Sequence, residues 1–255
     1  MSTAAIIQVR VIGALILRET RVRYGRSQFG YLWALGEPVA YVAAFSAMFT
    51  FTGSHAPFGN SMPLFYALGI LPFSLFRNLG NQLMMSFEAN EALLSFPIVM
   101  ELDTVYARTI LEAATMLVVM TLILSTIVMF SDAPPPNNPL KMAIAVFGLV
   151  ILGFGVGLIN AVVVSIFKSW QNVYSMMAIP LLLTSGVFYS LETLPTKVSE
   201  FLSWNPIVHG VEGMRDGYFN NYRAGALDIS YLFWWGLALT LIGLAAERAI
   251  RIRQS

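Results

Sequence analysis

Long runs of hydrophobic residues dominate this chain, and their lengths predict helices that cross a membrane. A helix that spans the hydrocarbon core of a bilayer needs about 20 consecutive, mostly apolar residues. The pattern therefore predicts an all-α polytopic membrane protein, folded as a single domain over residues 1–255. Six segments meet the length requirement and are predicted to be transmembrane helices: 31–52, 63–87, 104–130, 140–167, 173–189 and 229–247.

The long connector between the fifth and sixth of these segments, residues 190–228, has a different pattern. It holds weakly apolar stretches around Phe201–Leu202 and Ile207–Val211, which are too short to span a bilayer. Short helices that enter the membrane and return fit this pattern, provided that protein or water satisfies their backbone polar groups. The pattern is therefore compatible with a pair of re-entrant helices between the fifth and sixth spans.

The N-terminal segment 4–28 predicts an amphipathic helix that lies on the membrane surface. At helical spacing Ile7, Val11, Ala14 and Leu15 share a face, while the arginines lie elsewhere. Such a helix places its apolar face in the lipid boundary and its basic face toward the headgroups. A cleaved secretion signal is disfavoured, because the segment lacks a basic start.

The arginines predict which way the chain crosses the membrane. Loops near the ends of transmembrane helices carry an excess of Lys and Arg on the cytoplasmic side. Both termini are therefore predicted to be cytoplasmic, which an even number of spans allows. The arginines that carry this prediction precede the first span or follow the last: Arg10, Arg18, Arg21, Arg23, Arg26, Arg248, Arg251 and Arg253.

Composition excludes several classes of function. Only 11% of the residues are charged, against about 25% in soluble domains. The chain has no cysteine and only two histidines, so we expect no metal site, cofactor or nucleic-acid partner. A membrane enzyme such as an intramembrane protease is an alternative for which no catalytic motif is present. No GxxxxGK[ST] phosphate-binding loop occurs, so the chain cannot use ATP directly.

Two ionisable residues lie inside predicted spans, where charge is costly and often functional. Arg77 is near the middle of the second span and must face a cavity, an acidic partner or an anionic cargo. Glu37 lies in the first span, and two interpretations stay open: an ion pair with an arginine such as Arg26 or Arg77, or a place in a transport path. In the third span Glu112 follows Arg108 by four residues, which predicts an ion pair within that helix.

Aromatic residues near the span ends have two possible roles. Most belong to the interfacial belt that Trp and Tyr form at membrane boundaries. Because sugars also stack on aromatic rings, Tyr31, Trp33 and Phe76 join Arg77 and Glu37 as candidates for a substrate path. In the fourth span, Gly153 and Gly157 have the spacing that lets a neighbouring helix approach closely.

The predicted inner loop 88–97 is the candidate for binding a partner protein. It predicts a short helix that exposes Glu88, Asn90 and Glu91, offers apolar side chains such as Leu94 and Phe96 for docking, and ends at Pro97. The alternative is an ordinary helix on the membrane surface.

Three stretches together resemble the permease subunit of ABC-2 type exporters, in the branch that exports bacterial capsular polysaccharide. They are Arg21–Arg26 with Gly30–Pro38, Glu88–Leu94 with Pro97 and Asp103, and Trp204–Arg215. The resemblance covers essentially the whole chain. It implies the ABC-2 (type V) exporter fold, with the basic residues Arg21, Arg23 and Arg26 on the interface helix and 190–228 on the periplasmic side.

The resemblance also implies partners and a cargo. It implies a homodimer in the bacterial inner membrane that works with two ATP-binding subunits, which would hold ATP and Mg²⁺. Residues 88–97 would be the coupling helix seated in that subunit. The cargo would be a lipid-linked polysaccharide, passed to periplasmic and outer-membrane export proteins. An ABC-2 permease for O-antigen, teichoic acid or another lipid or drug is the alternative, which the short outer loops do not exclude.

Overall fold

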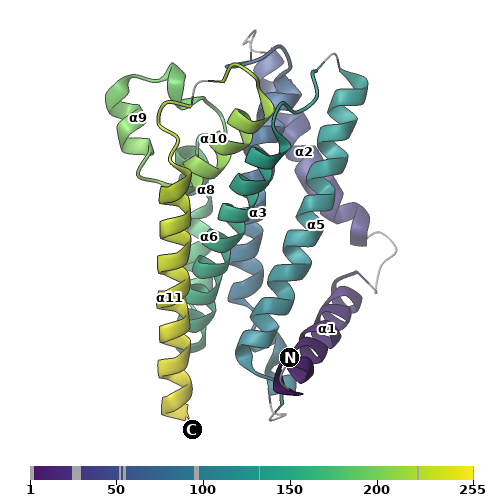
Figure 1. Ribbon diagram of the computed structural model, residues 1–255, viewed down its shortest axis with the longest axis vertical. Helices are drawn as coiled ribbons and strands as arrows, with labels where there is room; N and C mark the ends of the chain where they lie inside the picture. The colour runs from purple at the N-terminus through teal and green to yellow at the C-terminus, as the bar shows by residue number, and fades with distance from the viewer. Residues whose placement is uncertain are drawn as a thin grey trace.

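The computed structural model describes residues 3–24, 30–51, 53, 56–94, 98–131, 133–222 and 224–254, and the regular structure among these residues is entirely helical. Long helices stand roughly side by side, and both chain termini lie at the same end of the molecule (Figure 1). The predicted all-α class is therefore confirmed.

Five helices in the described part of the chain are long and apolar enough to cross a membrane. Each overlaps one of the predicted spans and differs from it by a few residues at the ends. Ser61 accepts a hydrogen bond from Leu64 N–H at the start of the second of these helices, and Asn138 caps the fourth in the same way. The five helices are α2 (Gly30–Phe51), α3 (Met62–Met84), α5 (Glu101–Phe130), α6 (Pro139–Ile166) and α11 (Ile229–Gln254).

The predicted span 173–189 is divided into two short helices, α7 (Trp170–Met176) and α8 (Ala178–Thr184). The division follows from Pro180, which cannot donate a hydrogen bond to the carbonyl of Met176 and whose ring crowds that carbonyl. At 1.5 Å per residue, the 15 residues from 170 to 184 reach roughly 22 Å, less than the ~30 Å hydrocarbon core. Gly186, with a φ of 72°, then turns the chain away from α8.

Helix α3 is the centre of the bundle. Most of its side chains are buried, and α2, α5, α6 and α10 (Pro206–Tyr218) pack around it. Close packing against α6 depends on the predicted glycine pair. A Cβ atom at Gly153 would lie 2.9 Å from Leu79 Cβ, and one at Gly157 would lie 2.7 Å from Leu83 Cβ. The prediction that these glycines allow close helix approach is confirmed.

The connector 190–228 contains the short helices predicted for it. They are η2 (Leu191–Thr193), α9 (Thr196–Leu202) and α10. Helices α9 and α10 lie at the end of the molecule opposite the two termini (Figure 1). Almost all of α10 is buried, and it packs on α3, α6 and α11.

At the other end, α1 (Thr3–Tyr24) lies obliquely against the lower part of α5 (Figure 1). The predicted N-terminal helix is present, and it packs on α5, a contact that the sequence did not predict. Ile7 is exposed, whereas Leu15 and Glu19 are buried. Polar side chains of α1 contribute to the contact with α5, because buried charged side chains of α5 pair with them. Two further short helices, η1 (Glu88–Asn90) and α4 (Glu91–Leu94), follow α3.

Candidate translocation pocket and coupling segment

Arg77 and Glu37 are brought together as an ion pair between α3 and α2. Arg77 Nη2 lies 2.6 Å from Glu37 Oε1, and neither side chain is fully buried, with 23% and 43% of their areas exposed. The guanidinium also lies 5.6 Å from the centre of the Tyr41 ring, within the range of a cation–π contact. Arg77 is therefore the arginine that pairs with Glu37. Arg26 lies outside the described residues.

The ion pair borders a cavity of about 370 Å³ between α2, α3, α7 and α8. Its wall combines this ion pair with three side-chain amides and aromatic rings. Phe76 contributes to the wall, although only 4% of it is exposed. The side chains of Tyr31 and Trp33 lie outside the described residues. The lining residues are Glu37, Phe73, Phe76, Arg77, Asn78, Asn81, Gln82, Tyr174, Ser175, Ala178 and Leu181.

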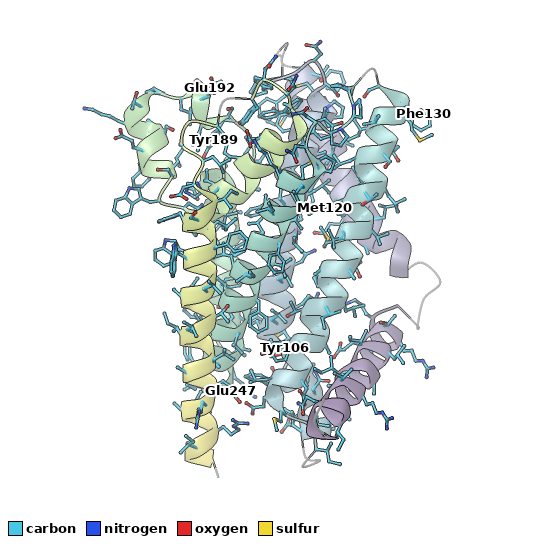
Figure 2. All side chains as sticks on the ribbon, in the orientation of Figure 1. Tyr106, Met120, Phe130, Tyr189, Glu192 and Glu247 are labelled. Carbon is cyan, nitrogen blue, oxygen red and sulfur yellow. The ribbon has the colours of Figure 1, made fainter. Side chains whose placement is uncertain are left out.

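This pocket suits a polar ligand at membrane depth. A cation and several amides in a low-dielectric surrounding favour anionic or hydroxyl-rich groups, because unsatisfied polar groups there are costly. A second cavity, of about 490 Å³, lies between α5 and α6 and is lined mainly by apolar side chains, among them Met120 (Figure 2). Among the described residues, no group of three or more potential metal ligands comes together.

The coupling segment, defined here as η1 and α4 (Glu88–Leu94), follows α3 at the end of the molecule that holds the termini. Glu88 and Glu91 are exposed and Leu94 is half-buried. Asn90 is 1% exposed, so the prediction that it is exposed is wrong. Phe96 and Pro97 lie outside the described residues.

Asn90 is buried because it belongs to a polar cluster with Arg18, Glu19 and Arg108, which we name the Glu19 cluster. Asn90 donates to Glu19 Oε1 at 3.2 Å and accepts from Arg18. Arg108 donates to the same Glu19 oxygen from Nε and Nη2, at 3.1 Å each. Glu19 was missed by sequence reasoning, although it is the only acidic residue before the first span.

The ion pair predicted between Arg108 and Glu112 is wrong. Arg108 pairs with Glu19 of α1, and Glu112 pairs with Arg23 of α1. Helical spacing permits a pair between Arg108 and Glu112, but charged side chains of α1 pair with both of them instead. Of the other basic residues predicted on the interface helix, Arg21 is exposed.

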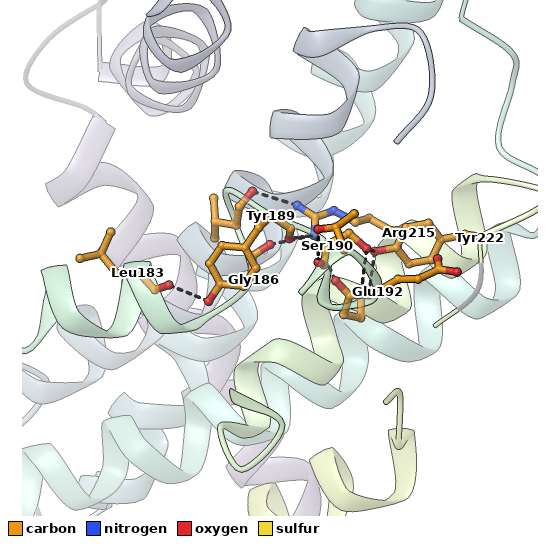
Figure 3. A network of polar contacts seen from close by, with 10 residues as sticks. Leu183, Gly186, Tyr189, Ser190, Glu192, Arg215 and Tyr222 are labelled. Atoms are coloured by element: carbon orange, nitrogen blue, oxygen red, sulfur yellow. Dashed lines mark hydrogen bonds and ion pairs between the residues drawn. The ribbon is translucent and has the colours of Figure 1, made fainter. Parts of the chain in front are cut away.

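A second buried polar cluster fixes the chain that follows α8 (Figure 3). Arg215 of α10 is fully buried. It donates from Nη1 to the carbonyls of Gly186 at 2.7 Å and Tyr189 at 2.8 Å, and from Nη2 to that of Val187 at 2.9 Å. Its guanidinium also lies 3.9 Å from the centre of the Phe65 ring on α3.

Glu212 and Tyr222 complete this cluster. Glu212 lies 3.2 Å from Arg215 Nη1 and accepts from Tyr222 O–H at 2.7 Å, and the Tyr222 oxygen lies 2.7 Å from Ser190 Oγ. Breaking one partner of such a buried pair is strongly destabilising, because it leaves an uncompensated charge. Sequence reasoning placed Glu212 and Arg215 in a characteristic stretch but did not predict their contacts.

Five helices that are long and apolar enough to cross a membrane, with a polar pocket beside α2 and α3, are typical of an integral membrane protein. The chain belongs to the ABC-2 type transporter family, whose characteristic sequence pattern matches residues 10–219. The match runs from within α1 to the end of α10, so it includes the pocket, the coupling segment, the Glu19 cluster and all of the second polar cluster except Tyr222.

Individual relatives extend over nearly the whole chain. It is 32% identical to the polysialic acid transport protein KpsM of Escherichia coli over 242 residues, which are 95% of this chain and 94% of KpsM. It is also 32% identical to the capsule polysaccharide export inner-membrane protein BexB of Haemophilus influenzae, over 93% of this chain and 90% of BexB. Identity to the O-antigen export system permease protein RfbA of Klebsiella pneumoniae is 23%, over 92% and 90%. The resemblance to capsular polysaccharide export permeases is confirmed.

Proposed function

We propose that this chain is the membrane-spanning permease subunit of an ATP-driven transporter that exports lipid-linked capsular polysaccharide across the bacterial inner membrane. The observation that carries the proposal is the near full-length similarity to KpsM and BexB, whose names state polysialic acid transport and capsule polysaccharide export. The pocket at Arg77 agrees with it, because an acidic or hydroxyl-rich polymer needs polar contacts within the hydrocarbon region.

The energy comes from a partner in this proposal. The sequence has no phosphate-binding loop, so two copies of a separate ATP-binding subunit would hold ATP and Mg²⁺. We assign its docking to residues 88–97, where Glu88 and Glu91 are exposed. Asn90 would act from inside the protein rather than by touching the partner, and Leu94, Phe96 and Pro97 would complete the docking surface.

The path for the polysaccharide would run between two copies of the chain. The pocket formed by α2, α3, α7 and α8 supports this, with Arg77, Glu37 and Phe76 in its wall and Tyr31 and Trp33 on the same helix as Glu37. Helices α7 and α8 together would act as the fifth of six crossings. Both termini would then lie in the cytoplasm, and residues 190–228 would face the periplasm and its export proteins.

Purification of the tagged protein in mild detergent from its native host tests the proposal. We expect an ATP-binding subunit to co-purify in roughly equal amount. A chain that purifies without an ATPase and catalyses a reaction alone would contradict it. An O-antigen permease is the weaker alternative, because identity to RfbA is lower. It predicts that deletion of the gene removes O-antigen from the cell surface and leaves the capsule.

A further inference from the structure

Glu19 is a carboxylate in an otherwise basic helix, and only 7% of it is exposed. A buried carboxylate persists only when its charge is paired and its oxygens accept hydrogen bonds. Oε1 of Glu19 accepts three: from Arg108 Nε and Nη2 at 3.1 Å each and from Asn90 Nδ2 at 3.2 Å. The position of Glu19 is therefore determined by two different elements, α5 and η1.

Arg108 and Asn90, which donate to Glu19, also bind residues of other elements. Arg108 also donates from Nη1 to the carbonyl of Gln82 on α3 at 2.8 Å. Asn90 also donates to the carbonyl of Ser86, directly after α3, at 2.8 Å, and accepts from Arg18 of α1. One carboxylate thus connects α1, the end of α3, the coupling segment and α5. Charge-assisted bonds in a buried setting are stronger than neutral ones in water.

Two other contacts between α1 and α5 lack this connection. Arg23 pairs with Glu112, and Gln8 donates to Asp103. Both contacts attach α1 to α5, but neither contact includes a residue of the coupling segment. The contacts of Arg23 and Gln8 therefore attach α1 to α5 alone. The Glu19 cluster also connects α1 to the segment that we assign to ATPase docking.

We propose that Glu19 is a positioning residue for transport: it joins the coupling segment to α1 and α5, so that a movement imposed on Glu88–Leu94 displaces both helices together. The transport role rests on the proposed function. The rigid joint itself does not, because it follows from contacts within this chain alone.

The spread of distances between α1 and the coupling segment measures how rigid this joint is. Since the chain has no cysteine, Leu17→Cys on α1 and Ala89→Cys in η1 give two unique spin-labelling sites, both exposed. Pulsed electron paramagnetic resonance on the full-length protein in nanodiscs should give one narrow distance distribution for the two labels within a chain. Proteins labelled at only one of the two sites identify the distances between the two copies of the proposed homodimer. Glu19→Gln should broaden it, because the amide lacks the charge that holds Arg108. Asn90→Ala should broaden it as well, although the Glu19–Arg108 pair remains.

Glu112→Gln is the matched control, since it removes a buried carboxylate that also pairs α5 with an arginine of α1. It should leave the distribution narrow. Size-exclusion chromatography and thermal unfolding identify any variant that fails to fold, and Asn90→Ala leaves the buried ion pair intact. An unchanged distribution in both Glu19→Gln and Asn90→Ala would overturn the inference.

The transport role is measured in proteoliposomes that contain the permease with its ATPase. Glu19→Gln should retain the bound ATPase and ATP turnover within about twofold, while polysaccharide exported per ATP falls about tenfold, a usual size for coupling between sites. Glu112→Gln should retain the export ratio. If no ATPase binds the wild-type protein, the proposed function fails while the distance result stands. If ATPase binds and Glu19→Gln exports normally, only the positioning role fails.

Discussion

At the scale of single residues, Arg77 has two possible roles: it contacts the cargo, or it only pairs with Glu37. The pair is partly exposed to the pocket, so the guanidinium has donors left for a ligand. Arg77→Ala should lower export of an acidic polysaccharide about tenfold or more, because hydrogen bonds to charged groups contribute roughly 1.5–3 kcal/mol and about 1.4 kcal/mol is a factor of ten. Export into proteoliposomes with labelled polymer measures this.

Glu37→Gln separates the two explanations. It removes the counter-charge but keeps Arg77, so export of an acidic polymer should persist if the guanidinium contacts the cargo. Equal loss in both variants would mean that the ion pair only holds α2 against α3. Normal export by Arg77→Ala would remove Arg77 from the path.

His209 on α10 predicts a dependence of stability on pH. Its Nε2 lies 2.8 Å from the Ser203 carbonyl, and its Nδ1 accepts from the backbone N–H of Asp228 at 3.0 Å. The ring is therefore neutral, with its proton on Nε2. Burial lowers the pKa of His209, and the Ser203 carbonyl and the Asp228 charge offset this only in part.

Because the folded-state pKa of His209 lies below the ordinary value of about 6.5, the unfolded chain binds a proton more readily as the pH falls. The stability contributed by neutral His209 is complete above that value and is lost as the pH falls below it. The melting temperature in detergent should therefore decrease from pH 7.5 to about pH 5.5. His209→Gln keeps a donor for Ser203 and should show a weaker decrease. Equal decreases in both proteins would assign the effect to other groups.

The sequence predicts some of these residue contacts and not others, for a physical reason. Arg77 and Glu37 were found because charges inside a membrane span require a partner. Arg108 and Glu112 satisfied the local rule for a helical pair, yet both pair with α1. Their partners are about 90 residues away in sequence, so only the packing of α1 on α5 determines them.

At the scale of elements, the α3–α6 contact depends on glycine. Gly157→Ala would place a Cβ atom 2.7 Å from Leu83 Cβ and 3.1 Å from the carbonyl oxygen of Leu79. Such overpacking costs about 1–3 kcal/mol, so thermal unfolding in detergent should begin at a lower temperature. Gly36→Ala on α2 is the matched control, since a Cβ there meets no atom within 4 Å.

Alanine is a better helix former than glycine, so Gly36→Ala should leave the melting temperature unchanged or raise it. A Gly157→Ala protein as stable as the wild type would mean that α3 and α6 separate readily at this point.

Hydrophobic run length located five long helices but did not predict that a sixth segment is divided into two short ones. The run 173–189 is apolar enough to span, yet Pro180 and Gly186 divide and end it as α7 and α8. The chain beyond α8 is instead held by the carbonyls that Arg215 binds. Run length does not reveal this arrangement, because it depends on a buried cation contributed by α10.

At the scale of the whole molecule, the described faces of α2 and α11 remain largely uncovered by the rest of the chain, with 17% of each apolar window buried. In a bilayer, lipid or a second copy covers such faces. The pocket at Arg77 borders α2, so a second copy placed there would enclose it. This geometry supports the proposed homodimer, in which the pocket would lie near the axis between the two copies.

Exposed glutamates at both ends of the molecule allow a test of where the ATPase docks. Glu88 and Glu91 are exposed in the coupling segment, while Glu192 and Glu200 are exposed at the opposite end, where Figure 2 labels Glu192. Reversing Glu88 and Glu91 to lysine should weaken binding of the ATPase about tenfold or more, because like charges across an interface cost several kcal/mol. Co-purification and the rate of stimulated ATP hydrolysis measure this.

Reversal of Glu192 and Glu200 to lysine changes the net charge of the chain by the same amount at the other end. That control should bind the ATPase normally if docking is local to the coupling segment. Equal loss in both proteins would assign the effect to net charge, and normal binding after reversal of Glu88 and Glu91 would move the contact elsewhere. Loss restricted to the first protein would place the ATPase at the end where α1 and the Glu19 cluster lie, so that the docked subunit acts directly on the proposed joint.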